Sequence, residues 1–180
     1  IMQEFRRGQV PKELNVLNSV ADVNQAIHFA AISAVERKGG YIKIASNLHG
    51  DFMRQQLSII LPDHPELPVT HLISLLPASP DIETRKENIR RLGRIFPLIF
   101  SRGNYEPLYQ YENDPGLNGS SMMPNVMITP DSVLTFSALW DRGLYFSGAE
   151  SIRFFPDFFE KRKNECRYLG RRNLSLNEEL

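Results

Sequence analysis

The chain has 180 residues, of which 42% are hydrophobic and 23% are charged, and these ordinary values exclude wholesale disorder. Its 21 basic and 21 acidic side chains give zero net charge, which argues against a basic nucleic-acid-binding module. A single cysteine excludes an intrachain disulfide framework and a multi-cysteine zinc site. No apolar run reaches the roughly 18 residues that span a bilayer, so we expect a soluble, cytoplasmic protein.

Helical and strand patterns alternate through the first half of the chain. The predicted helices cover residues 19–38, 51–62 and 82–100, and the predicted strands cover 41–45, 69–76 and 105–111. Ser19 or Asp22 can cap the first helix, and Asp51 is expected to cap the second, because a short side-chain oxygen can accept from free backbone N–H groups. The apolar strand at 69–76 is typical of strands that are buried on both faces.

Strands cluster in the second half. A loop is expected at residues 115–121, and a hairpin over 126–129 and 133–137, with Pro130 and Asp131 in its turn. A further strand follows at 143–146, and a final helix at 149–167. The whole pattern predicts an α/β fold, in which helices flank a mixed β-sheet.

Small polar side chains follow two of the predicted strands, where open α/β sheets place their ligand crevice. Ser46, Asn47 and His49 lie between the first strand and its helix, and Ser74 lies near the end of the second strand. We predict a ligand site at these four residues. Because the carboxylate of Asp51 would disfavour a strong anion, we expect a neutral or zwitterionic metabolite. The alternative is a solvated loop beside a capped helix.

Motifs that carry chemistry are absent from the sequence. It contains no Gly-x-Ser-x-Gly elbow, no Walker loop and no His-Glu-x-x-His pair. We therefore predict no catalytic residue, no metal and no cofactor, and we expect that the chain is not an enzyme. The alternative is a phosphoesterase-type enzyme with an unrecognised site that uses His49 and His71.

Two further clusters have simple structural interpretations. The basic residues of the 82–100 helix alternate with glutamates, which favours a solvated, salt-bridged face: Arg85, Lys86, Arg90, Arg91 and Arg94. The final helix carries two aromatic pairs at i, i+4 spacing, Phe154 with Phe158 and Phe155 with Phe159. These rings can pack on the sheet or form the seam of a homodimer, for which they are our candidate surface.

Two stretches of the sequence resemble the C-terminal region of Cro/repressor-type helix-turn-helix regulators from Firmicutes. One is residues 68–77, and the other is residues 124–166, which contain the hairpin, the glycine-led strand and the aromatic helix. This resemblance implies a single effector-binding or oligomerisation domain over residues 1–180. It also implies a homodimer, and DNA binding by a helix-turn-helix domain outside this segment. The start at Ile1 is as consistent with a segment of a longer protein as with an ordinary processed N-terminus.

The same hairpin-then-helix ending is similar to the phospholipase D superfamily fold. In that family a His-x-Lys motif is followed by an aspartate and then by Gly-Ser. Met127, Ile128 and Thr129 stand here where the histidine and lysine are expected, so no catalytic residue of the family is carried over. The resemblance implies the fold, reused as a sensing domain.

Overall fold

The computed structural model describes residues 14–112 and 125–169. Its helices are α2 (Val20–Glu36), α3 (Asp51–Asp63), α4 (Ile82–Ile99) and α5 (Ala149–Lys163). Its strands are β1 (Leu14–Leu17), β2 (Ile42–Ala45), β3 (Val69–Leu75), β4 (Tyr105–Tyr111), β5 (Asn125–Ile128), β6 (Val133–Phe136), β7 (Gly143–Phe146) and β8 (Arg167–Tyr168). The predicted loop at 115–121 and the chain from Gly170 onward lie outside the described residues.

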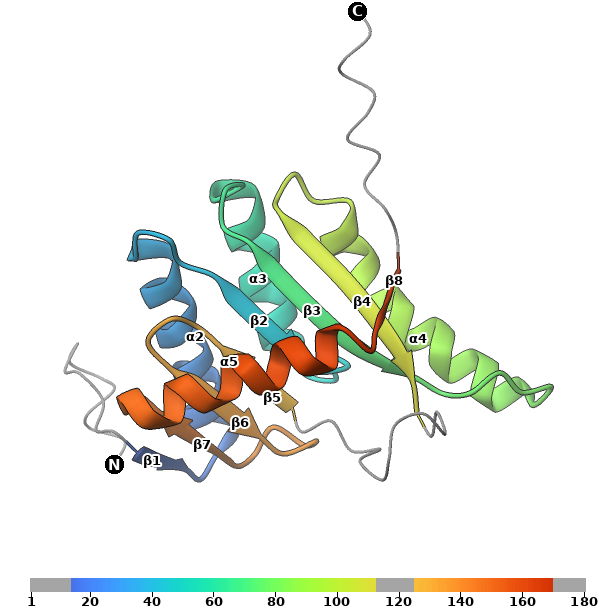
Figure 1. The fold of residues 1–180 in the computed structure, drawn as a ribbon. Helices are drawn as coiled ribbons and strands as arrows, with labels where there is room; N and C mark the ends of the chain where they lie inside the picture. The colour runs from blue at the N-terminus through green and yellow to red at the C-terminus, as the bar shows by residue number, and fades with distance from the viewer. Residues whose placement is uncertain (1–13, 113–124, 170–180) are drawn as a thin grey trace, which may run out of the picture.

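All eight strands belong to one mixed sheet, in the order β1-β7-β6-β5-β2-β3-β4-β8 (Figure 1). β2, β3 and β4 are parallel and are joined by the crossover helices α3 and α4. β5 pairs antiparallel with β2, and the hairpin continues the sheet through β6, β7 and β1. The carboxyl ends of the three parallel strands therefore meet at one edge, and β5 begins there too.

Helices cover both faces of the sheet, which confirms the predicted α/β architecture. α2, α3 and α4 lie on one face, and α5 crosses the other (Figure 1). The larger core fills the first interface and includes Ile27, Ile44 and Leu61. A smaller core under α5 joins Phe159 to sheet residues such as Leu72 and Val133.

The start and end of α2 follow from local chemistry. The Ser19 hydroxyl accepts from the backbone N–H of Asp22 at 3.1 Å, and the Asp22 carboxylate accepts from the N–H of Asn18 at 3.1 Å. Both oxygens thus satisfy N–H groups at the helix start. Beyond the helix, Gly39 has φ +73°, which favours glycine. At Gly40 a Cβ would lie 1.8 Å from the Ala34 carbonyl oxygen, so no larger residue fits there.

Two boundary predictions are wrong, and two edge strands are missing from the sequence prediction. Asp51 is not the cap of α3: Gly50 holds that position, and Asp51 pairs with Arg54 in the first turn. α5 ends at Lys163 rather than at residue 167, and Arg167 belongs to β8. The short edge strands β1 and β8 have four and two residues, too few for a period to show in the sequence.

Within the described ranges, none of the helices combines the length and the apolar character that crossing a membrane requires.

Candidate functional site

Polar side chains gather at the edge where the parallel strands end. Asn47, just after β2, donates from Nδ2 to the hydroxyl of Ser74 at 2.9 Å and accepts from the Ser74 backbone N–H at 3.0 Å. The Ser74 hydroxyl donates in turn to the carboxylate of Glu112, just after β4, at 2.9 Å. These bonds tie together the ends of three neighbouring strands, so the structure brings Asn47 and Ser74 together, and their role in binding a ligand stays a prediction.

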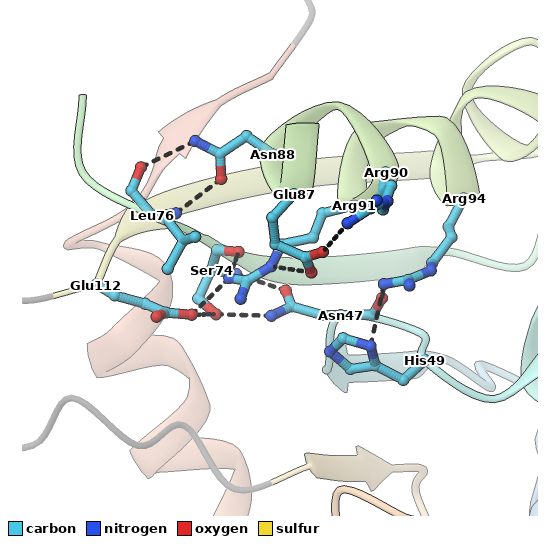
Figure 2. A network of polar contacts seen from close by, with 10 residues as sticks. All are labelled: Asn47, His49, Ser74, Leu76, Glu87, Asn88, Arg90, Arg91, Arg94 and Glu112. Atoms are coloured by element: carbon cyan, nitrogen blue, oxygen red, sulfur yellow. Dashed lines mark hydrogen bonds and ion pairs between the residues drawn. The ribbon is translucent and has the colours of Figure 1, made fainter. Parts of the chain in front are cut away.

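α4 inserts Arg91 into this edge (Figure 2). Its guanidinium donates to the Ser74 carbonyl at 2.9 Å and pairs with Glu112 and with Glu87, the latter at 3.1 Å. Burial alone would raise the pKa of Glu87, but the hydrogen bond and charge of Arg91, together with the charge of Arg94, lower it on balance. The network therefore holds charged side chains in fixed mutual positions.

Arg94 lies one turn further along α4 and reaches His49. Its Nη1 donates to Nδ1 of His49 at 3.1 Å (Figure 2). An arginine can only donate, so Nδ1 must accept, and the proton of the neutral ring is then on Nε2. Partial burial, followed by the charges of Arg94 and Arg91, lowers the pKa of His49. His49 is thus a neutral ring at neutral pH, with its Nε2–H left to donate.

Ser46 faces the opposite direction from this network. It is buried, its hydroxyl donates to Oδ1 of Asn125 at 2.9 Å, and it accepts from the N–H of Leu48 at 3.1 Å. Its carbonyl accepts from Nε2 of His71 at 2.7 Å. Ser46 therefore joins β2 to β5 and to β3, rather than adding a group to the ring of Asn47, Ser74 and Glu112.

His71 is a core residue. It is fully buried, and its Nδ1 lies 2.6 Å from the hydroxyl of Tyr105. Because the Ser46 carbonyl can only accept, Nε2 carries the proton and Nδ1 accepts from Tyr105. Burial lowers the pKa of His71 to about 4. Both ring nitrogens are engaged in the interior, so His71 does not serve the phosphoesterase alternative that named it.

A surface hollow of about 670 Å³ lies on the other side of His49. His49 and Asp51 supply polar lining, and Val20, Phe52, Leu139 and Trp140 supply apolar lining. Gly50 lets the Trp140 ring pack against the backbone in the wall of this hollow, because a Cβ at that position would lie 2.7 Å from the ring. His49 thus lies between the charged network and a mainly apolar cavity.

The prediction of a solvated, salt-bridged face on α4 holds for only part of it. Lys86 pairs with Glu83 and Arg90 with Glu87 on the exposed side. Arg91, however, is 9% exposed and belongs to the site. The helical repeat could have predicted that Arg91 is buried. It precedes the apolar residues Ile95 and Leu98 by four and seven positions, and so lies on the same buried face of the helix.

The segment at which the phospholipase D resemblance places a His-x-Lys motif is buried. Met127, Ile128 and Thr129 are at most 1% exposed. Any catalytic group of this chain would therefore come from other residues. Across residues 14–112 and 125–169, no three His, Cys, Asp or Glu side chains are grouped so that they could hold a metal ion.

No family model and no curated protein sequence matches the chain. Several solved structures, however, match it in fold. TrmBL2, an archaeal chromatin protein with a novel mode of DNA binding, matches 93% of the chain with a TM-score of 0.52 and 12% identity; the chain spans only 59% of TrmBL2. NucT from Helicobacter pylori matches 86% of the chain over 96% of its own length, with a TM-score of 0.57 and 18% identity. Polyphosphate kinase from Porphyromonas gingivalis matches at a TM-score of 0.44.

NucT, a nuclease, has a phospholipase D-like fold, so this comparison supports the same fold for the chain. It also corrects one prediction. We expected that the chain is not an enzyme, and that expectation is contradicted because the fold is shared with an enzyme over nearly the whole length of NucT. The resemblance to Firmicutes regulators has no match among these structures and stays a prediction.

Proposed function

We propose that this chain is the ligand-binding and oligomerising domain of a bacterial transcriptional regulator. In this proposal residues 1–180 form one domain, the chain acts as a homodimer, and DNA is bound by a different part of the parent protein. The likeness to TrmBL2, whose mode of DNA binding is described as novel, supports a DNA-associated role. The zero net charge of the chain favours DNA contact through another segment.

The observation that carries the ligand-binding part is the position of His49. Its ring contacts Arg94 on one side and lines the 670 Å³ hollow on the other. The Nε2–H of His49 and the guanidinium of Arg94 can donate to a carboxylate or carbonyl, and the Asp51 carboxylate at the rim can accept from an ammonium group. These groups suit a neutral or zwitterionic metabolite whose apolar part enters the hollow.

Ser46, Asn47 and Ser74 take a supporting role in this proposal. The Ser46 side chain bonds Asn125 on β5, and Asn47 and Ser74 bond each other. We expect these bonds to hold the loop that presents His49, rather than to leave free groups for the ligand.

A thermal-shift screen against amino acids, nucleosides and other small neutral or zwitterionic metabolites tests the proposal. A ligand at 100 times its Kd raises the free energy of unfolding by about 2.7 kcal/mol. Calorimetry on a hit then compares His49→Ala with His28→Ala, whose ring is exposed on α2 and bonds Gln56. We expect at least a tenfold loss of affinity (about 1.4 kcal/mol) in His49→Ala alone. Unchanged affinity in that variant would refute the assignment.

The regulatory part has its own test. A basic helix-turn-helix segment of roughly 60–80 residues in the parent reading frame would support it. A parent protein that has no DNA-binding segment and does not bind DNA would contradict it.

A phosphoesterase activity is the second candidate, favoured by the fold shared with NucT and by the His49–Arg94 pair. In this role Arg94 would turn from Nδ1 of His49 to hold a phosphodiester anion, and the freed Nδ1 would accept a proton. Release of nitrophenol from bis(p-nitrophenyl) phosphate tests it, as does cleavage of DNA. The activity should fall at least a hundredfold in His49→Ala and stay unchanged in His28→Ala.

A further inference from the structure

α4 carries a row of large apolar side chains on its outer face. Ile82, Ile89, Phe96 and Phe100 are 62%, 68%, 49% and 82% exposed. At 100° per residue these four positions lie within about 40° of one another around the helix axis. The buried residues Ile95 and Leu98 lie on the opposite side and face the core. The row is thus a second apolar face, separate from the one that packs on the sheet.

Glycine 93 lies in the middle of the same face. Glycine weakens a helix interior, and the described residues leave room for a side chain here, because a Cβ built at this position would meet none of their atoms within 4 Å. Ile82, Ile89 and Phe96 are spaced by seven residues, the repeat of helices that pack along a seam. A small residue at the centre of such a seam lets a second helix approach closely. We call Ile82, Ile89, Gly93, Phe96 and Phe100 the α4 outer face.

We propose that the α4 outer face binds the same face of a second copy, with the two helices antiparallel about a two-fold axis near Gly93. Ile89 precedes Gly93 by four residues and Phe96 follows it by three. At 1.5 Å per residue, Ile89 of each copy then lies level with Phe96 of the other. The two central side chains of the row therefore contact each other in both halves of the dimer.

Charge at the two ends of the helix fits the antiparallel arrangement. Glu83, which pairs with Lys86, lies in the first turn of α4, and the exposed Arg102 lies three residues beyond its end at Ile99, so an antiparallel pair brings these carboxylate and guanidinium ends of the two copies together. The helix dipoles also oppose each other in this orientation. α4 and the residues just after it thus supply both signs of charge and the apolar centre, as a self-complementary two-fold interface requires.

The area is sufficient for a weak dimer. The four apolar side chains expose on the order of 500 Å² per copy, so pairing would bury about 1,000 Å² in total, the lower limit for a specific interface. The aromatic helix that we predicted as the dimer surface offers less. Of the four aromatic rings on α5, only that of Phe154 is largely exposed, and that of Phe159 is buried in the core. This inference names the surface of the proposed homodimer and does not depend on ligand binding or regulation.

Sedimentation equilibrium of the full chain from about 1 to 200 µM tests the proposal. We expect a concentration-dependent dimer that Ile89→Lys weakens at least tenfold and that Phe154→Lys on α5 leaves unchanged. Gly93→Leu is the sharper variant, because it should raise the Tm of the monomer while it weakens the dimer at least tenfold. A monomer at every concentration would overturn the proposal, as would a dimer that only Phe154→Lys disrupts.

Crosslinking tests the orientation in a Cys166→Ser background. Gly93→Cys should form a disulfide with a second copy of itself. Ile89→Cys should crosslink to Phe96→Cys in a mixed sample but not to itself. Efficient self-crosslinking of Ile89→Cys would show parallel helices and overturn the two-fold arrangement. Each result is independent of the calorimetry on His49, so one proposal can fail without the other.

Discussion

Burial of His71 makes folding depend on pH in a way that can be calculated. The neutral ring donates from Nε2 to the Ser46 carbonyl, a bond that protonation of Nδ1 would leave in place, and it accepts from Tyr105 at Nδ1, a bond that protonation would remove. The folded-state pKa is about 4, against 6.5 for an unperturbed histidine. The unfolded chain therefore binds more protons than the folded chain between these two values. The contribution of the neutral His71 ring to the free energy of unfolding is fully present above about pH 6.5 and is lost as the pH decreases toward 4.

The magnitude follows from the two pKa values. Each pH unit between them corresponds to about 1.4 kcal/mol in the free energy of unfolding, so the full loss approaches about 3 kcal/mol. About 2 kcal/mol of this loss is reached at pH 5. Glu87 and Glu106 also have lowered pKa values, and their contributions are lost as the pH falls through the acidic range. Because they are common to all variants, a difference between variants isolates His71.

Urea unfolding at pH 8 and pH 5 measures the effect. We expect the wild-type free energy of unfolding to fall by about 2 kcal/mol more than that of His71→Gln, which cannot titrate. His28→Gln is the matched control, since its ring is exposed, and it should keep the wild-type pH dependence. Equal pH dependence of the wild type and His71→Gln would show that burial of this ring is not coupled to stability.

Three further outcomes follow from the site and from Cys166, which lies between α5 and β8. Asn47→Ala removes both bonds to Ser74 and should lower the free energy of unfolding by about 1–3 kcal/mol in urea titrations. Arg91→Met leaves two carboxylates of the network without their cation, so it should lower the free energy of unfolding by about 2–3 kcal/mol. Arg90→Met on the exposed side should lower it by less than about 0.5 kcal/mol. Burial raises the pKa of Cys166 to about 11, so iodoacetamide at pH 7.5 should modify it roughly a hundredfold more slowly than the unfolded chain. Equal rates in buffer and in urea would contradict that pKa.

Most elements of the fold were predictable because each carries its own local signal. The hairpin has two apolar runs around Pro130 and Asp131, and β3 is apolar over nearly its whole length. β1 and β8 are edge strands of four and two residues, and neither follows a turn motif or carries a long apolar run that would mark it in the sequence. Asp51 shows a related limit: its carboxylate could cap a helix, but Arg54 one turn later holds it inside the helix instead.

The site was predictable in part for a topological reason. Residues that follow parallel strands meet at one edge, which is why Asn47 and Ser74 could be placed together before the structure was known. Glu112 and Arg91 could not be placed in this way. They enter from the end of β4 and from the middle of α4, and their contacts depend on how α4 packs against the sheet.

The network also limits where a ligand can bind. Arg91 is saturated by Ser74, Glu87 and Glu112, and a ligand that displaced any of these partners would leave a charge buried without its counter-ion. Arg94 differs, because among the described residues no carboxylate lies within ion-pairing distance of its guanidinium, and it contacts neutral His49 instead. A ligand can bind there without breaking an ion pair. At this edge of the sheet, Asn47 and Ser74 are therefore held by hydrogen bonds within the chain. His49 and Arg94, beside the hollow, can exchange their mutual contact for one with a ligand.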